Sequence, residues 1–184
     1  MSEKYRTIVA DPPWHYDRTG VTFEDASSGR FRGSGVPYAT MTVDEIAALP
    51  VRALADSDAH LYLWTTQRYL RDAYRIAEAW GFTVSCALVW CKRPTGWNVG
   101  GTFMSTVEFV LFGRRGSLKA NTRINSQWFE WPRGAHSAKP EAFIDMVEQV
   151  SPPPYVELFA RRHRLGWDVW GDQSANTATM DVTV

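Results

Sequence analysis

A chain of 184 residues with 45% hydrophobic and 22% charged residues has the size and composition of one globular domain with a sizeable core. Its 20 basic and 20 acidic side chains cancel, and a formal net charge of zero argues against a protein that holds nucleic acid by bulk electrostatics. Nine tryptophans are an unusual number, and they can supply both core volume and stacking surfaces for bases.

Motif spacing disfavours several classes of site. Cys86 and Cys91 lie on a strand-like run where their side chains point to opposite faces, so neither a disulfide nor a metal site is predicted. The four histidines lack a metal-ligand spacing, and no G-x-G-x-x-G or P-loop occurs. Without a signal peptide or a membrane-spanning apolar run, we expect a cytoplasmic protein with no membrane contact.

The first half of the chain begins with a short apolar run over residues 6–10, which predicts a buried strand. Residues 15–37 are rich in Gly, Ser and charge and predict a long mobile loop, which inside a compact domain is usually functional or disordered. Thr42 opens a T-V-D-E sequence, the pattern of a capping box, so a short helix is expected there. A strand over residues 60–64 and an amphipathic helix over residues 67–80 follow.

The middle of the chain contains two further strands and two further loops. Residues 82–90 form a long apolar run, and residues 107–112 form another that is expected to end at a Gly-Arg-Arg sequence. Gly-rich residues 94–104 and polar residues 116–136 are predicted loops. Residues 139–150 have their apolar side chains at helical spacing, which predicts an amphipathic helix.

The last part of the chain predicts strands over residues 155–160 and 167–170, followed by a polar, frayed tail over residues 174–184. Buried strands that alternate with helices are typical of an α/β fold. We therefore expect a single domain over residues 1–184 with a mostly parallel sheet, an antiparallel strand at its edge and helices on its faces.

Polar residues follow three of the predicted strands. Asp11 comes directly after the first strand, and Arg161, His163, Asp172 and Gln173 follow the last two. Ligands of such sheets bind outside the carboxyl ends of the strands. If these strands are neighbours, one crevice collects all of these side chains.

Asp11-Pro12-Pro13-Trp14 is the most informative motif. Asp11 and the Pro12 carbonyl can accept hydrogen bonds from an exocyclic NH₂ group, and Trp14 can stack on the ring that carries it. The two prolines stiffen the turn and donate no N–H, which is expected to leave its carbonyls available to a ligand. The alternative is an ordinary Pro-Pro turn after a strand, with Trp14 as a core residue.

Several separated motifs occur together in one order. They are D-P-P-W at 11–14, V-P-Y-A-T-M at 36–41, L-Y-L-W at 61–64, H-S-A-K-P-E at 136–141, E-L-F-A-R at 157–161 and W-D-V-W-G-D-Q at 167–173. In this order they resemble the MT-A70-like adenine-N6 methyltransferases, over roughly Thr7 to Gln173. The resemblance implies a Rossmann-like fold and S-adenosyl-L-methionine as the methyl donor, with S-adenosyl-L-homocysteine as product.

The resemblance also implies roles for individual residues. Asp11 and the Pro12 carbonyl would hold the N6 amine, and Trp14, with Tyr38, would pack against the base. Asp11 would also border the cofactor. Lys139 would meet the cofactor carboxylate with His163 nearby, Glu157 and Phe159 would shape the cofactor cleft, and Arg161, Asp172 and Gln173 would contact the ribose.

Some of these residues have simpler alternatives. Lys139 and His163 could be solvated surface residues, and Glu157 could form a structural ion pair with Arg161 or Arg162. Asp172 stands where an Asn is frequent in the family, so it can still accept a hydrogen bond but has lost a donor.

Basic residues in the predicted loops are expected to contact phosphates, and neighbouring tryptophans to stack on bases. The residues of this expected substrate surface are Arg30, Arg32, Lys92, Trp97, Arg114 and Arg115. Scattered solvated charges are the alternative explanation. The small form resembles bacterial or phage members that modify DNA, so DNA is favoured over RNA, with specificity supplied by the loops, a second copy or a partner subunit.

Two other functions stay open. A non-catalytic nucleic-acid-binding subunit is disfavoured by the intact D-P-P-W and Lys139. An amide methyltransferase that acts on protein glutamine would have an Asn before the two prolines and a Tyr or Phe after them, where this chain has Asp11 and Trp14.

Overall fold

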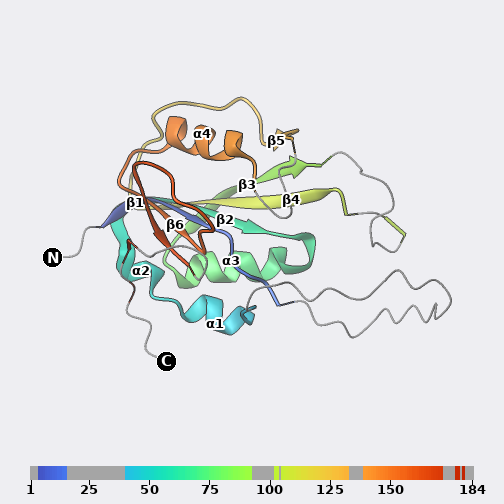
Figure 1. Ribbon diagram of the computed structural model, residues 1–184, viewed down its shortest axis with the longest axis horizontal. Helices are drawn as coiled ribbons and strands as arrows, with labels where there is room; N and C mark the ends of the chain where they lie inside the picture. Colours follow the sequence, from blue (N-terminus) through green and yellow to red (C-terminus); the bar gives the residue numbers. More distant parts are fainter. Residues whose placement is uncertain are drawn as a thin grey trace.

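The computed structural model describes residues 4–15, 40–92, 102–103, 105–132, 139–171, 177–178 and 180. Its centre is a seven-stranded sheet with the order β5-β3-β4-β2-β1-β6-β7 (Figure 1). The strands are β1 (Tyr5–Ala10), β2 (Ala55–Thr65), β3 (Thr83–Cys91), β4 (Val107–Arg115), β5 (Trp128–Phe129), β6 (Tyr155–Leu158) and β7 (Trp167–Trp170). The helices are α1 (Val43–Ala48), α2 (Val51–Leu54), the 3-10 turn η1 (Gln67–Tyr69), α3 (Leu70–Ala79) and α4 (Glu141–Val150).

The sheet is mostly parallel, as predicted. Strand β4 is antiparallel to β2 and β3, and the other four pairings are parallel, so six strands run in one direction. The predicted place of the antiparallel strand was wrong, because β4 lies inside the sheet and not at its edge. The chain passes from β2 through α3 to β3 and leaves room for one strand between them. Strand β4 fills that place, and because it is antiparallel to β3 it needs no crossover helix.

Some strands differ in extent from the prediction. Strand β4 continues through Gly113, where a stop was expected, because β2 and β3 supply hydrogen-bonding partners on both sides. Glycine also suits this position sterically, since an added Cβ would lie 3.2 Å from the Cβ of Phe82. Strand β5 lies inside the predicted loop 116–136, where Val89 N donates to Gln127 O at 2.7 Å and pairs this segment with β3.

The predicted helix boundaries have clear physical causes. Thr42 and Glu45 form the expected capping box, in which Glu45 N donates to Thr42 Oγ1 at 3.2 Å and Thr42 N donates to Glu45 Oε2 at 2.7 Å. Gly81 follows α3 with a φ of +86°, the conformation of a glycine stop. Helix α4 begins two residues later than predicted, because Pro140 holds Lys139 outside the helical region.

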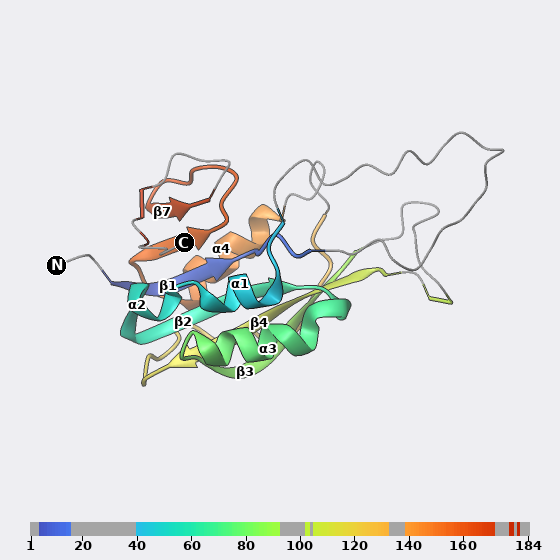
Figure 2. The ribbon, with the colours of Figure 1, turned by 90° about the horizontal axis from the view of Figure 1, so that it is seen from below.

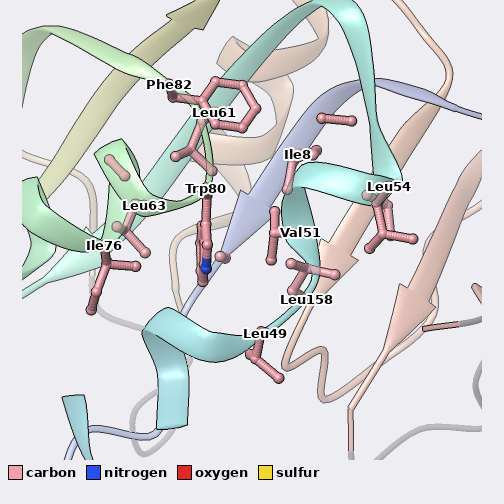
Figure 3. Close-up of a cluster of buried hydrophobic side chains, with 14 of the residues drawn as sticks. Ile8, Leu49, Val51, Leu54, Leu61, Leu63, Ile76, Trp80, Phe82 and Leu158 are labelled. Carbon is pink, nitrogen blue, oxygen red and sulfur yellow. The ribbon is translucent and has the colours of Figure 1, made fainter. Parts of the chain in front are cut away.

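Helices cover both faces of the sheet. Helix α4 lies on one face, and α1 and α3 lie on the other (Figures 1 and 2). The buried cluster under α4 includes Tyr62, Trp64 and Phe143. The opposite cluster joins the sheet to the other helices through residues such as Leu61 and Trp80 (Figure 3). None of the helices in the described ranges is long and apolar enough to cross a bilayer.

A directed hydrogen-bond chain is buried beside α4. His60 Nε2 lies 3.1 Å from Leu118 O, and because a carbonyl only accepts, this nitrogen carries the proton. His60 Nδ1 therefore accepts from Ser151 Oγ at 2.8 Å, and Ser151 Oγ accepts from the Tyr62 hydroxyl at 2.8 Å. Burial lowers the pKa of His60 below its ordinary value, so this histidine is held neutral in the folded protein.

Replacing Ser151 with Ala is expected to lower the free energy of unfolding by about 1–3 kcal/mol, because it leaves buried His60 Nδ1 and Tyr62 Oη without their partner. Urea denaturation measures the change. Ser117→Ala is a control on an exposed serine, where a change within about 0.5 kcal/mol is expected if only its bond to Asp58 is lost. Equal effects of the two substitutions would contradict a special role for the buried chain.

Candidate active site

The alternation of side chains along the strands directs several polar groups to the α4 face. Val9 and Val110 are buried in the cluster beneath α4. Asp11 and Glu108 are each two residues away from one of these valines, so the period of two turns them toward the same face. Because β4 is antiparallel, its beginning lies beside the ends of its neighbours: Glu108 pairs in register with Trp90 near the end of β3. The two carboxylates therefore meet at the carboxyl edge of the sheet.

Lys139 links these carboxylates. Its Nζ lies 2.9 Å from Asp11 Oδ1 and 3.0 Å from Glu108 Oε2, and it lies 4.8 Å from the ring centroid of Trp64. The other oxygen of Glu108, Oε1, accepts from Lys92 Nζ at 2.7 Å. Lys92, Glu108, Lys139 and Asp11 thus form a row of alternating charges, called here the lysine–carboxylate chain. All four side chains are between 16% and 22% exposed, so water screens them only in part.

The lysine–carboxylate chain shifts the pKa values of its own members. Burial raises the pKa of Asp11 above its ordinary value, against the opposing effect of the Lys139 ammonium. Burial alone would lower the pKa of Lys139, but Asp11 and Glu108 together raise it, so the ammonium stays charged. Burial would raise the pKa of Glu108, but Lys139 and Lys92 outweigh it and hold the pKa below the usual range. Glu108 is therefore a fixed negative charge at neutral pH.

Glu157 is a second unusual carboxylate at this edge. Burial, followed by the nearby charge of Asp11, raises its pKa to about 7. It makes no hydrogen bond or ion pair within the ranges that the structure describes. The alternative of a structural ion pair with Arg162 is not observed, since Arg162 pairs with Glu141. Glu157 therefore presents a half-buried acceptor that other described residues leave unused.

The turn after β1 is stiff, but its carbonyls are not left unpaired as expected. Pro12 O accepts from Trp14 N at 2.9 Å, and Pro13 O accepts from Met41 N at 2.9 Å. The physical reason is that a tight turn closes on its own backbone, and Met41 adds a bridge to the same segment. A carbonyl oxygen has two lone pairs, so the Pro12 carbonyl can accept one further hydrogen bond.

Trp14 lies in the core and not over an open site. Its side chain is 6% exposed, and its ring stacks on Tyr69 with centroids 5.0 Å apart and planes at 14°. It belongs to the cluster on the α3 side of the sheet, whereas Asp11 contacts Lys139 on the α4 side. This placement matches the alternative in which Trp14 is a core residue, and it leaves no open ring face for stacking on a base.

The backbone after β6 adopts an unusual conformation. Phe159 has a φ of +64°, although it is not glycine, and its N–H donates to Trp170 O of β7. Gly171 allows the two segments to approach, because an added Cβ would lie 2.8 Å from Ala160 N. Strain of this kind is often found at binding sites. The Phe159 conformation changes the direction of the backbone directly after β6, the strand that contains Glu157. Arg161 and His163, both exposed, come next along the chain.

The expected substrate surface does not form as a unit. Lys92 lies at the carboxyl edge, bound to Glu108. Arg114 and Arg115 pair in register with the middle of β2, about 20 Å along β4 from that edge. Arg115 there donates to backbone carbonyls, including Arg52 O at 2.9 Å. They were expected beside Lys92 because β4 was predicted to stop before them. Other residues predicted for the site lie outside the described residues: Arg30, Arg32, Tyr38, Trp97, Asp172 and Gln173.

Sequence reasoning missed Glu108 and Trp64 as members of this site. Glu108 interrupts the apolar run V-E-F-V-L-F, and a charged residue inside a buried strand is a signal of a paired or functional group. The pattern around Trp64 predicts a strand and part of a motif, but nothing in it reveals an ammonium over the ring. Both contacts depend on Lys139, which is distant in sequence.

Comparisons with known proteins agree on one family. The MT-A70 family model matches residues 5–173. A Type II methyltransferase, M.MunI from Mycoplasma, is 33% identical over 182 residues, which covers 92% of this chain and 77% of that protein. A putative N(6)-adenosine-methyltransferase MT-A70-like protein of Medicago truncatula is 30% identical over 97% of this chain. The human N(6)-adenosine-methyltransferase catalytic subunit METTL3 is 27% identical over 98% of it.

These relatives differ in length. The chain covers 77% of the Mycoplasma protein, but only 28% of the Medicago protein and 30% of the human one. The similarity therefore concerns nearly all of this chain and a minor part of the plant and animal relatives.

Proposed function

Because the chain belongs to the MT-A70 family of S-adenosylmethionine-dependent adenine-N6 methyltransferases, we propose that it methylates the N6 amine of adenine in DNA. The observation that carries the proposal is the Asp11 carboxylate at the end of β1, which Lys139 holds at 2.9 Å through one oxygen only. Its second oxygen, Oδ2, makes no hydrogen bond to any described residue and is available to a substrate amine.

Adenine N6 is a poor nucleophile, because its lone pair is delocalised into the ring. A hydrogen bond from N6–H to Asp11 Oδ2, and a second to the remaining lone pair of the Pro12 carbonyl, would pull the nitrogen out of the ring plane and free its lone pair. The rigid Pro-Pro turn holds both acceptors in place before the substrate arrives, so little reorganisation is needed. Asp11 need not be a strong base, since the amine becomes acidic only when it gains the methyl group.

The residues at the carboxyl edge fit the proposed cofactor. When bound, S-adenosylmethionine supplies an electrophilic methyl group on a positively charged sulfur. Its ammonium and ribose hydroxyls are donors, and Glu157 is a half-buried acceptor whose carboxylate makes no hydrogen bond in the described part of the chain. Lys139 is the cation that contacts Asp11, and we assign the cofactor carboxylate to it, with Arg161, whose charge also acts on Asp11, kept for the ribose. That carboxylate would share the Lys139 ammonium with Asp11 and Glu108.

The preference for DNA rests on how much of each relative's length this chain covers. This chain covers 77% of a Type II methyltransferase, whereas it covers less than a third of the relatives that are named adenosine methyltransferases. A base in duplex DNA would have to leave its stack to reach Asp11 at the sheet edge, which costs a few kcal/mol and is avoided in single strands. RNA is the second candidate, supported by the names of those longer relatives.

The test is methyl transfer from labelled S-adenosylmethionine to single-stranded DNA, duplex DNA and RNA of mixed sequence, followed by digestion to nucleosides. N6-methyldeoxyadenosine is the expected product. N6-methyladenosine from RNA alone would overturn the choice of DNA but keep the reaction. Absence of a product on all three polymers, with S-adenosylhomocysteine bound in calorimetry, would overturn independent catalysis by this chain and favour a requirement for a partner subunit.

A further inference from the structure

Within the lysine–carboxylate chain, Glu108 contacts Lys139 and Lys92 but not Asp11. We propose that Glu108 is a positioning residue, which directs the Lys139 ammonium at Asp11 while Lys92 balances its charge. The proposal rests on the proposed function, since it gives Glu108 a part in the same methyl transfer.

The directions around the Lys139 ammonium support this role. An ammonium has three N–H donors. Two of them are directed at Asp11 Oδ1 and Glu108 Oε2, at 2.9 and 3.0 Å, and the Trp64 ring lies on a further side at 4.8 Å. Glu108 and Trp64 come from β4 and β2, which are rigid parts of the sheet. They hold a long, flexible side chain that would otherwise have many rotamers available.

The position of Lys139 in the fold makes such support necessary. It lies before α4, and Pro140 separates it from the first helical residue. The helix therefore does not restrict its backbone as an interior position would. Without Glu108, the ammonium could turn toward solvent, and Asp11 would lose both its orientation and the charge that opposes the effect of burial.

Lys92 balances the negative charge of Glu108. A second anion close to Asp11 would raise the pKa of Asp11, as Glu108 does here to a small degree. Lys92 Nζ, 2.7 Å from Glu108 Oε1, offsets that anion and helps to keep it ionised. The salt bridge to Glu108 also makes Lys92 less available to a phosphate, although Lys92 lies at the site.

A double-mutant cycle tests whether Glu108 acts through Lys139. Glu108→Gln is expected to lower kcat by about 10- to 100-fold at neutral pH with little change in the KM for DNA, the cost of misplacing a catalytic group. Lys139→Met is expected to lower kcat at least as much. If Glu108 acts through Lys139, the double variant is no slower than Lys139→Met alone. Effects that multiply, or a Glu108→Gln enzyme with wild-type kcat, would overturn the proposal.

The pH profile separates positioning from a merely structural role. Lys139 lowers the pKa of Asp11 more than Glu108 raises it, so a Glu108→Gln variant that releases Lys139 should shift the acidic limb of kcat/KM, which reports ionisation of Asp11, to higher pH. A shift to lower pH would mean that only the charge of Glu108 was lost and that Lys139 kept its place. A loss of folded protein would reduce activity without moving that limb. Glu78→Gln, on the exposed side of α3, is the matched control and should leave both rate and profile unchanged.

Urea unfolding of the cofactor-free variants distinguishes this proposal from the proposed function. The change in the unfolding midpoint of the double variant is expected to differ from the sum of the changes for Glu108→Gln and Lys139→Met, because the two side chains are in contact. If they are non-additive but the wild-type protein methylates no polymer, the proposed function fails and the contact stands. If they are additive, Glu108 does not hold Lys139, and the positioning role fails whatever the activity.

Discussion

An Asp11→Asn variant is expected to fold normally and to lose about 10²- to 10⁴-fold in kcat, the range seen when a positioned catalytic group is removed. Asparagine keeps the size of the side chain but removes the anion that Lys139 orients. It also places an NH₂ donor where an acceptor is needed, so N6 loses a hydrogen bond and gains a repulsive contact. Because burial already disfavours the charged form of Asp11, the folded protein should tolerate a neutral replacement well.

The measurement is labelled methyl transfer to the preferred polymer under single-turnover conditions, with urea denaturation as a check on folding. Glu78→Gln is a suitable control, because Glu78 is an exposed carboxylate near the end of α3, next to the segment that leads into the start of β3. Retention of more than a tenth of the wild-type rate in Asp11→Asn would show that this carboxylate is not the acceptor of the N6 amine.

A Trp80→Ala variant is expected to lose about 3–5 kcal/mol of unfolding free energy, the usual cost of removing a fully buried large aromatic side chain. Trp80 is 1% exposed and lies directly after α3, where it packs between the helices and the sheet (Figure 3). Its indole N–H also donates to Ile46 O at 3.2 Å, so the substitution removes one of the two hydrogen bonds that this carbonyl of α1 accepts, the other coming from Leu49 N. The effect should therefore include loosening of α1 against α3.

Tyr74→Ala is the matched control for this variant. Tyr74 is an aromatic residue of α3 but is 38% exposed, and its replacement should change the unfolding free energy by about 0.5 kcal/mol or less. Urea denaturation of both variants gives the comparison. A Trp80→Ala protein as stable as Tyr74→Ala would mean that the contact between α1, α3 and the sheet is not part of the cooperative core.

Local patterns predicted the elements of the fold well, because each depends on neighbouring residues. The capping box at Thr42 and the stop at Gly81 were both confirmed by the backbone. The direction and place of β4 were not predictable in the same way, since its length is decided by partners in β2 and β3. Strand β5 was missed for the same reason, because a two-residue strand exists only through its pairing with β3.

In the site, too, local motifs identified residues, but contacts between distant parts of the chain were not predicted. The motif order identified Asp11 and Lys139, and the structure brings them within 2.9 Å. The sequence offered a core position for Trp14 only as the alternative and did not identify Tyr69 as the ring that covers it, and it did not show that Arg115 would lie at the opposite edge from Lys92. These outcomes follow from side-chain packing and strand direction, which depend on residues far apart in the chain.

The antiparallel course of β4 has a consequence for how this fold tolerates insertions and deletions. In parallel strands, a length change in the loop after the strand alters the site without moving the strand. Glu108 instead lies at the start of β4, so one residue added between Glu108 and Val110 would turn its carboxylate from the α4 face to the opposite face. Length variation before β4 should therefore be accommodated upstream of Val107, with the spacing from Glu108 to Phe112 kept constant in any functional redesign.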